Sequence, residues 1–229
     1  MDALLDMQRL QAPIPDRPST PFPLFVLDDV LPGDAAGELE SDFPRYRSAG
    51  FFPYAPEDCG PSMRAVVEQM TSKAFGDAVG RQLGIEGLGD KPTLATLCRS
   101  LNRRHGTIHT DSKSKIVTAL LYLNADWPAT SDGCLRFLGK IDDIDALVVP
   151  EIRPVYGTLA AFKREENSFH GHLPFEGERR VVQVAWLTSE DEKLRKTKRG
   201  RFSRGLKRVL GALDKRFGAG RDDNASHPD

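Results

Sequence analysis

The chain has 229 residues, of which 39% are hydrophobic and 28% charged, a composition typical of one soluble globular domain. No segment approaches the roughly 18 consecutive apolar residues of a membrane-spanning helix, which argues against an integral membrane protein. The formal net charge of −1 hides an asymmetry, because residues 193–221 contain twelve Lys or Arg and one acidic residue, which leaves the rest of the chain acidic.

The N-terminal third predicts an extended lead-in followed by helices. Residues 1–19 are rich in proline and precede a short predicted strand within 22–32. A helix capped near Asp34 is expected over 33–43. Apolar residues at helical spacing then predict one or two amphipathic helices over 61–85, with Ser62 as N-cap.

The pattern changes near residue 92 to short β-prone runs separated by Gly, Pro, Asp and Asn. Such runs, each a few residues long, indicate an antiparallel sandwich or barrel. We therefore expect a mainly β domain over residues 20–190 with flanking N-terminal helices. The predicted strands are 93–102, 115–124, 134–139, 146–152, 157–164 and 179–187.

The stretch GTIHTDSKSKIVTALLYLN, residues 106–124, places His109 and Asp111 just before a predicted buried strand. On an extended chain, residues two apart share a face, so an imidazole and a carboxylate can close on one cation. A strand-end histidine hydrogen-bonded to an aspartate explains the same triplet equally well.

A second histidine cluster lies downstream, where His170 and His172 share a face if the segment is extended. Two histidines and one carboxylate form a facial triad, which leaves open positions on a metal and suits non-haem Fe(II) oxygenases. A structural zinc site would need four closed ligands, and no cysteine is placed to help.

Arg180 begins an apolar predicted strand, where a buried cation needs an anionic partner. We expect no acid of the same strand to provide one, so a ligand carboxylate is the candidate partner, because the planar guanidinium binds carboxylates in bidentate fashion. Arg179 is interpreted as a surface residue at the strand end.

These residues together resemble the iron- and 2-oxoglutarate-dependent dioxygenase superfamily, and in particular its prolyl 4-hydroxylase-like branch. The likeness consists of the His109-Thr110-Asp111 triplet, His170 after the aromatic Phe169, and Arg180 ten residues further on. It extends over about residues 20–190. One departure is Asp132, which stands where the family commonly has the first of two glycines.

The resemblance implies a double-stranded β-helix, the jelly-roll or cupin-like fold, in which His109, Asp111 and His170 bind Fe(II). It implies 2-oxoglutarate and O2 as cosubstrates, with Arg180 on the distal carboxylate of 2-oxoglutarate and Thr118 or Tyr122 as a hydroxyl donor beside it. Burial of one strand face explains the alternation of Thr118, Leu120 and Tyr122 almost as well. Because Asp111 is present, hydroxylation is expected in place of halogenation, with succinate and CO2 as products.

Two further residues are candidates for contact with the substrate. His172 could replace His170 as a metal ligand, but the aromatic residue before His170 and its spacing from Arg180 favour His170, so His172 is expected to face the pocket. Arg136 either projects into the barrel to bind an acidic substrate or forms a surface salt bridge.

Residues 191–229 form a basic tail, in which an apolar stripe at helical spacing runs from Phe202 to Phe217. Such a cationic amphipathic helix either lies on an anionic membrane, through residues 193–221, or docks on the acidic body. The absence of an aromatic platform or a known binding fold argues against nucleic acid as a partner. The three cysteines lack C-x-x-C spacing and the N-terminus lacks a secretory pattern, so we expect a cytoplasmic protein, peripheral to the inner face of the membrane if the tail binds there.

Membrane contact would favour a cell-envelope sugar or a lipid-linked intermediate as the substrate. The alternatives are a peptidyl, prolyl-type hydroxylase and a non-catalytic β-helix binding module. A cupin-type hydrolase or isomerase that holds zinc or manganese in the same ligands is a further alternative. The primary substrate itself cannot be read from the sequence, because different chemistries share this kind of core.

Overall fold

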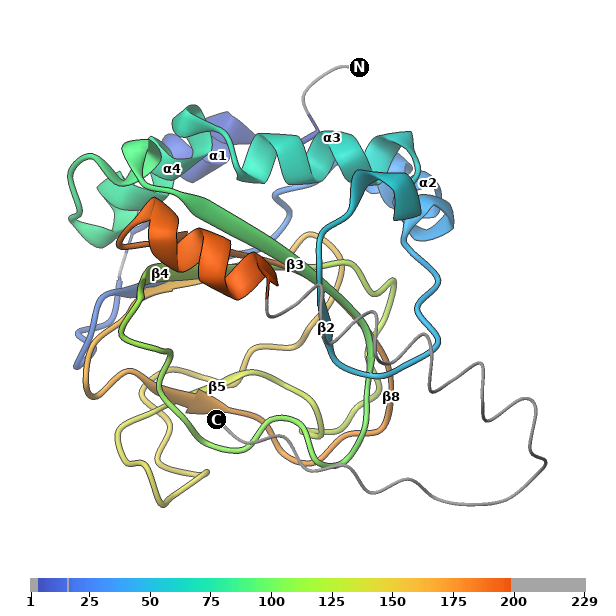
Figure 1. Ribbon diagram of the computed structural model, residues 1–229. Helices are drawn as coiled ribbons and strands as arrows, with labels where there is room; N and C mark the ends of the chain where they lie inside the picture. Colours follow the sequence, from blue (N-terminus) through green and yellow to red (C-terminus); the bar gives the residue numbers. More distant parts are fainter. Residues whose placement is uncertain (1–3, 16, 199–229) are drawn as a thin grey trace.

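The computed structural model describes residues 4–15 and 17–198. Two antiparallel β-sheets face one another, and the N-terminal helices cover the outer side of the larger sheet (Figure 1). The mainly β fold with N-terminal helices is therefore confirmed, and its two facing sheets match the expected double-stranded β-helix.

The larger sheet has six strands in the order β1-β6-β4-β8-β3-β2. Its strands are β1 (Leu24–Leu27), β2 (Phe51–Pro53), β3 (Thr93–Leu101), β4 (Lys115–Tyr122), β6 (Leu159–Lys163) and β8 (Gly177–Leu187).

The smaller sheet pairs β5 (Arg136–Leu138) with β7 (Phe169–Gly171). Isolated bridges widen it on both sides, from His109 to His170 and from Leu135 to Ile152. The strand expected over 146–152 thus appears only as bridging residues, because proline at position 150 has no backbone N–H for a regular ladder. The smaller sheet is what brings the two histidine segments together.

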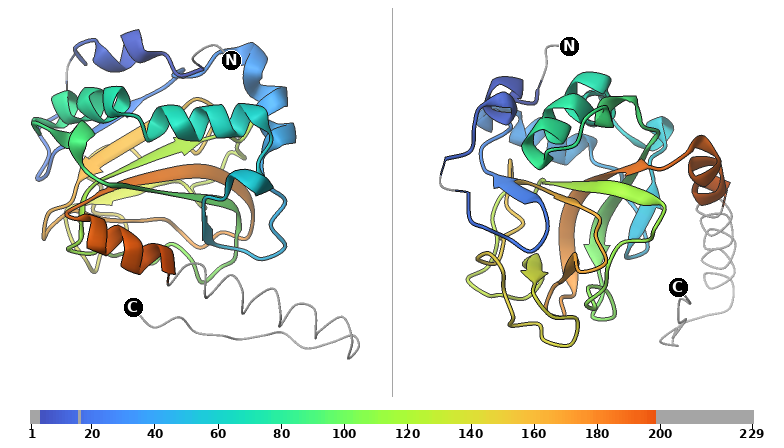
Figure 2. Two further views of the ribbon diagram at one scale, coloured as in Figure 1. Left: turned by 45° about the horizontal axis from the view of Figure 1, so that its top comes forward. Right: turned by 90° about the vertical axis from the view of Figure 1, so that its left-hand side faces the viewer.

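The helices are short and lie on one side of the larger sheet (Figure 2). They are α1 (Met7–Gln11), α2 (Ala36–Asp42), α3 (Pro61–Met70) and α4 (Lys73–Leu83), with 3-10 turns η1 (Gly33–Ala35), η2 (Pro56–Asp58) and η3 (Leu88–Asp90). A further helix over 190–198 follows β8. Helix α1 was not expected in the lead-in; its Asp6 side chain caps it by accepting from the Arg9 amide.

The expected helix caps differ from the observed ones. Helix α3 has Gly60 as its N-cap, and Ser62 lies inside its first turn. The carboxylate of Asp42 accepts hydrogen bonds from both the amide and the hydroxyl of Ser62, each at 2.8 Å. A side chain from α2 therefore satisfies the first turn of α3, a long-range partner that local sequence does not reveal. Asp34 makes no capping bond, since the N-cap of α2 is Ala35.

Alternation along the central strands divides the core in two. Val182, Val184 and Trp186 of β8 pack against the helices, and the Trp186 ring stacks on Phe75 of α4 with centroids 6.0 Å apart. Val181 faces the opposite side, in a second cluster with Tyr122 between the two sheets. Side chains of even and odd number in β8 thus enter different environments.

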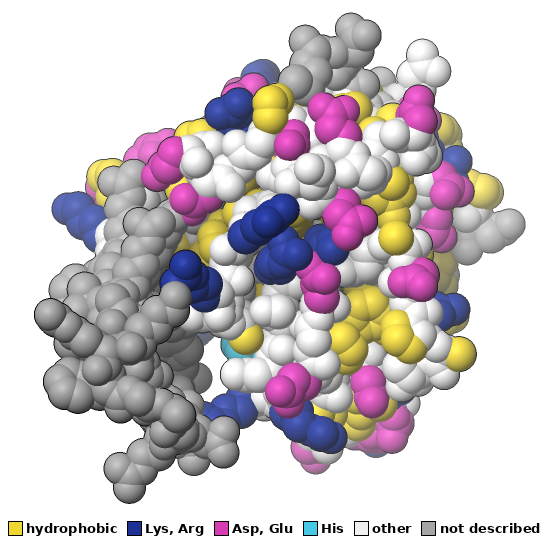
Figure 3. Space-filling view, turned by 90° about the vertical axis from the view of Figure 1, so that its right-hand side faces the viewer, with side chains coloured by type: hydrophobic (Ala, Val, Ile, Leu, Met, Phe, Trp, Pro, Cys, Tyr) yellow, Lys and Arg dark blue, Asp and Glu magenta, His cyan; other side chains and the backbone are white. Residues whose placement is uncertain are grey.

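The surface mixes charges of both signs. Figure 3 shows one face on which Lys and Arg side chains lie next to Asp and Glu. Among the described residues, no helix combines the length and apolarity needed to cross a bilayer. The predicted amphipathic stripe from Phe202 to Phe217 lies outside the described residues, so its docking or membrane contact remains a prediction.

Candidate metal centre

The structure brings His109, Asp111 and His170 together. Their potential ligand atoms all lie within 4.8 Å of one another. His109 and His170 are held in register by two backbone hydrogen bonds of 3.0 Å, each amide donating to the carbonyl of the other residue. The strand pairing therefore places residues 61 positions apart on one site.

Both imidazole rings are oriented by backbone carbonyls. Nδ1 of His109 lies 2.8 Å from the Thr107 carbonyl oxygen, and Nδ1 of His170 lies 2.9 Å from that of Ser168. A carbonyl can only accept, so each Nδ1 carries a hydrogen, and in the neutral form of each ring the lone pair is on Nε2. Both rings are thus prepared to coordinate a metal through Nε2.

Asp111 is buried and held from two sides. Its Oδ1 accepts from Lys115 Nζ at 2.6 Å and its Oδ2 from the Thr118 hydroxyl at 2.5 Å. Burial alone would raise the pKa of Asp111, but the charges of Lys115 and His170 and the two hydrogen bonds hold it well below its usual range. The carboxylate is therefore ionised at neutral pH.

His170 lies in an apolar environment. Its ring centroid is 4.5 Å from that of Phe162 and 6.3 Å from that of Phe137. Burial is the main reason that the pKa of His170 falls to about 4, against an opposing effect of Asp111. The imidazole is neutral at pH 7, which is the form that binds metals.

This donor set fits Fe(II). Two neutral imidazoles and one carboxylate cover one side of an octahedral ion and leave positions for a cosubstrate and O2. Within residues 4–15 and 17–198 these three form the one cluster of His, Cys, Asp or Glu with metal-ligand geometry. A closed structural zinc site would need a fourth protein ligand, which the cluster lacks.

Comparison with known proteins agrees with this site. Residues 96–188, which contain the whole triad, match the family model described as the 2OG-Fe(II) oxygenase superfamily. The match identifies the part of the chain that contains the triad, residues 96–188, as a 2OG-Fe(II) oxygenase domain. The protein is an iron- and 2-oxoglutarate-dependent oxygenase with His109, Asp111 and His170 as its metal triad.

Solved structures share the oxygenase fold at low sequence identity. A prolyl-4-hydroxylase from Pseudomonas putida has 19% identity and a TM-score of 0.51, over 73% of this chain and 94% of that one. A viral collagen prolyl hydroxylase from Paramecium Bursaria Chlorella virus-1 has 14% identity and a TM-score of 0.52, over 78% of this chain and 98% of that one. No curated protein is significantly similar in sequence.

Arg180, the arginine expected to bind 2-oxoglutarate, lies between two acidic side chains. Arg180 donates to Glu40 Oε1 at 2.6 Å through Nη2 and to Glu178 Oε1 at 2.9 Å through Nε. The expectation that Arg180 lacks an acidic partner in its own strand is therefore wrong, because Glu178 is two residues away on the same face. Its guanidinium is already neutralised.

Arg179 lies on the other face of β8, toward the second core cluster. It is 3% exposed, on the same strand face as Val181, so its interpretation as a surface residue is wrong. Its Nε donates to the Gly133 carbonyl at 2.8 Å and its Nη2 to the Tyr122 hydroxyl at 3.1 Å. No carboxylate of the described residues forms an ion pair with it, so the buried charge of Arg179 lacks an anion.

The two hydroxyl candidates have separate places. Tyr122 is fully buried and accepts from Arg179, beside the second core cluster. Thr118 donates to Asp111, so its hydroxyl already positions a metal ligand. Of the two residues, Tyr122 is the one that contacts Arg179.

His172 and Arg136 also receive clear positions. The amide of His172 donates to the Gly106 carbonyl at 2.9 Å, and burial followed by the charge of Arg179 lowers the pKa of His172 to about 4. Arg136 is buried and forms ion pairs with Asp145 at 2.5 Å and Glu151 at 2.8 Å. Of the two alternatives for Arg136, the structure therefore agrees with a salt bridge. Its guanidinium binds two acidic residues of the segment 139–151.

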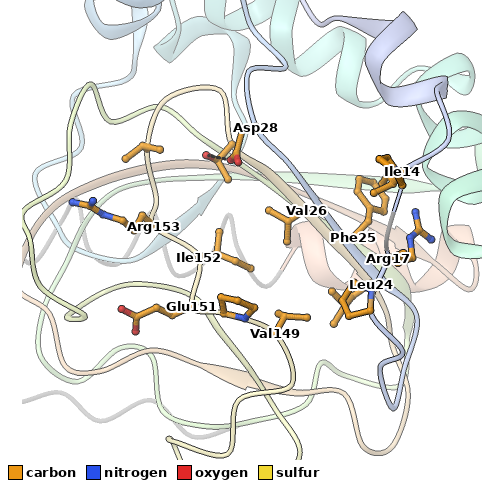
Figure 4. A pocket seen from close by; sticks show the side chains of 15 residues that line it. Ile14, Arg17, Leu24, Phe25, Val26, Asp28, Val149, Glu151, Ile152 and Arg153 are labelled. Atoms are coloured by element: carbon orange, nitrogen blue, oxygen red, sulfur yellow. Dashed lines mark hydrogen bonds between the residues drawn. The ribbon is translucent and has the colours of Figure 1, made fainter.

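A separate cavity of about 490 Å³ lies along the seam between β1 and residues 149–155 (Figure 4). Leu24, Val26 and Ile152 give it an apolar wall, with Arg17 and Arg153 among its polar side chains. None of the three metal ligands lines it. Its charged groups have partners, since Arg17 bonds Gln82 and Asp28 accepts from Thr158.

Sequence reasoning missed Arg179 and Lys115. A usable signal for Arg179 was present in the strand GERRVVQVAWL, where Val182, Val184 and Trp186 mark the helix-facing side. Arg180 has the same parity as these residues and Arg179 has the opposite one. Lys115 gave no signal, because its contact with Asp111 depends on the turn between them.

Proposed function

We propose that this oxygenase hydroxylates an unactivated C–H bond in a proline-containing peptide. One oxygen atom of O2 would enter the C–H bond to give the alcohol, and the other would enter succinate as 2-oxoglutarate loses CO2. Fe(II), when bound, supplies the redox chemistry that couples these two oxidations. The residues of the chain supply binding, orientation and charge.

The observation that carries this proposal is the buried pair of Arg179 and Tyr122. Tyr122 shares the second core cluster with Phe137 and Phe162, whose rings lie next to His170. Arg179 presents a planar cationic fork with no carboxylate partner among the described residues, and Tyr122 adds a hydroxyl 3.1 Å away. A carboxylate is the ligand that such a fork binds best. We propose that the distal carboxylate of 2-oxoglutarate pairs with Arg179 and Tyr122, while its keto-acid end faces His109, Asp111 and His170.

Three groups would orient the metal ligands. The Thr107 and Ser168 carbonyls fix the two imidazoles, and Thr118 fixes the carboxylate of Asp111. Such outer contacts hold ligands in place before a metal arrives, which lowers the reorganisation needed on binding. The apolar rings of Phe137 and Phe162 would shield the reacting centre from water.

The fold of the prolyl hydroxylases named above supports a peptide as the substrate class. The cell-envelope sugar or lipid-linked alternative depends on membrane contact by residues 193–221, most of which lie outside the described residues. A peptide is therefore the better-supported substrate, and sugars and lipid-linked intermediates are the competing candidates in the same assay.

The test is a succinate-release assay with Fe(II), 2-oxoglutarate and O2. Proline-containing peptides should stimulate succinate formation and gain 16 Da by mass spectrometry, an increment that follows from insertion of one oxygen atom in this reaction class. The variant Asp111→Ala should abolish both signals, since it removes one of the three ligands.

A matched anaerobic experiment separates binding from turnover. Adding Fe(II) and 2-oxoglutarate without O2 should give a weak visible charge-transfer band in the wild type and none in His109→Ala. If no band forms and 2-oxoglutarate does not bind, the oxygenase proposal fails. If the band forms but only sugars stimulate succinate release, the peptide class is wrong and the reaction class stands.

A further inference from the structure

Two lysines converge beside the metal-binding carboxylate. Lys115 Nζ lies 2.6 Å from Asp111 Oδ1, and its side chain is 13% exposed. Lys196 Nζ, from the helix over 190–198, donates to the hydroxyl of Ser112 at 3.0 Å. Ser112 directly follows Asp111 in the chain, so both ammonium groups lie close to this ligand.

The helix over 190–198 is anchored where it can deliver Lys196. The amide of Thr188 donates to the Ser114 carbonyl at 3.0 Å, which ties the end of β8 to the turn before β4. Figure 1 shows this helix, in orange, in front of the larger sheet. The anchor therefore brings a residue far along the chain to the rim of the triad.

The acids near this rim are committed to other cations. Glu192 bonds Arg195 at 2.6 Å, and Glu166 bonds Arg164 at 2.8 Å. No acid of the described residues lies within ion-pair distance of Lys196. Lys115 has only the metal ligand Asp111 as its acidic partner in this part of the chain.

Formal charges show what this arrangement favours. Fe(II), Asp111, the 2-oxoglutarate dianion and Arg179 together sum to zero, since both triad histidines are neutral ligands. Lys115 and Lys196 then leave an excess of two positive charges at the rim. A positively charged rim attracts an anionic group and repels a cationic one.

We propose that the substrate of this oxygenase is an acidic peptide, whose carboxylate side chains beside the oxidised residue pair with Lys196 and Lys115. This inference rests on the proposed function, because it assigns the substrate class of the same site. Lysine contributes a point charge without the planar fork of arginine, so the selection is for negative charge more than for one carboxylate geometry.

The experiment measures peptide binding to the full-length protein loaded with Mn(II) and 2-oxoglutarate, where Mn(II) replaces Fe(II) to prevent turnover. The probes are two fluorescein-labelled nonapeptides with one central proline, flanked either by glutamates or by glutamines. By fluorescence anisotropy, the glutamate peptide should bind at least about tenfold more tightly to the wild type. The advantage should shrink as salt concentration rises.

Two charge reversals on the same helix locate the effect. Lys196→Glu should abolish the preference, so that the glutamate and glutamine peptides bind with about equal affinity. Arg195→Glu is the matched control, because the side chain of Arg195 is 73% exposed and pairs with Glu192. Arg195→Glu makes the same charge change one residue away, and this variant should keep most of the preference for the glutamate peptide. Residues 199–229 are present in every variant, so their own affinity for acidic peptides is common to all.

Equal binding of the two peptides by the wild type would overturn the inference, as would undetectable binding of the glutamate peptide. Equal loss of preference in both variants would overturn it too, since long-range charge would then explain the effect. These failures differ from failure of the proposed reaction, which is read from the anaerobic Fe(II) and 2-oxoglutarate band, and from failure of the peptide class, which is read from succinate release. A protein that forms the band without preferring acidic peptides keeps its reaction and loses this substrate class.

Discussion

Arg179 donates to the hydroxyl of Tyr122 at 3.1 Å, and its guanidinium carbon lies 5.0 Å from the centre of the Tyr122 ring. The next residue, Arg180, points to the opposite face of β8 and is neutralised by Glu40 and Glu178. Two consecutive arginines of one strand therefore have different surroundings. Arg179 is a buried cation that forms no ion pair within the described part of the chain, and Arg180 is part of an ion-pair network.

The first prediction separates these two arginines. Arg179→Gln should weaken 2-oxoglutarate binding by about 100-fold, because it removes a charge-assisted bidentate partner for a carboxylate. The measurement is an anaerobic titration of the Fe(II) protein with 2-oxoglutarate, followed by the charge-transfer band.

Arg180→Gln is the matched control for this titration. It should leave the dissociation constant of 2-oxoglutarate within about threefold of the wild type. It should also lower the melting temperature, because the buried guanidinium loses its ion pairs with Glu40 and Glu178. If Arg180→Gln weakens 2-oxoglutarate binding and Arg179→Gln does not, the assignment of the two arginines is reversed.

The local sequence pattern predicted most of the helices and strands, but not which side chains form hydrogen bonds with the backbone groups at their ends. The strands over 93–102, 115–124 and 157–164 appear as β3, β4 and β6 with shifts of a few residues. Helix α1 was hidden in a proline-rich segment, where composition favours an extended chain. The first turn of α3 depends on Asp42, which lies 20 residues away in the chain.

The metal triad was predictable because two short motifs in the right order carry it. The arginine that we propose for 2-oxoglutarate was not predictable, because choosing between Arg179 and Arg180 requires the phase of β8. A shift of one residue moves every side chain to the other face. The contact of Lys196 with Ser112 spans 84 residues. No local pattern records such a contact, so charge convergence at the rim is visible only in three dimensions.

The second prediction concerns the hydroxyl that holds Asp111. Thr118→Val removes the 2.5 Å hydrogen bond to Asp111 Oδ2 with little change of shape. Loss of an outer contact to a metal ligand should lower the affinity for Mn(II) by about tenfold. Isothermal titration calorimetry of the metal-free protein measures it.

Thr158→Val provides the control for that titration. The Thr158 hydroxyl also donates to an aspartate, Asp28, at 2.9 Å and is 2% exposed, but it lies in the seam away from the triad. Its removal should leave Mn(II) affinity within about twofold. Equal affinity losses in both variants would mean that general destabilisation, not the contact with Asp111, weakens the metal site.

The third prediction tests the structural role of Arg136. Arg136→Met keeps the apolar stem of the side chain but removes its ion pairs with Glu151 and Asp145. Because Asp145 is 80% exposed, most of the loss comes from Glu151, and the free energy of unfolding should fall by about 1–3 kcal/mol. Urea unfolding measures the change, and peptide-stimulated succinate release should persist. Loss of turnover in a fully folded variant would restore Arg136 as a substrate contact.

The last prediction follows from a buried thiol. Burial raises the pKa of Cys98 to about 12, against the usual pKa near 8.5 of an exposed thiol. Between about pH 9 and 11 the unfolded chain loses this proton while the folded chain keeps it, so the folded state binds more protons and stability falls as pH rises. For one thiol the slope is about 1.4 kcal/mol per pH unit. Urea unfolding at several pH values under reducing conditions should therefore show a shallower decline in Cys98→Ala. The cavity left by the substitution lowers stability equally at every pH, and the other titrating groups are common to both proteins. Identical slopes of stability against pH would therefore mean that Cys98 ionises in the folded state as readily as in the unfolded one.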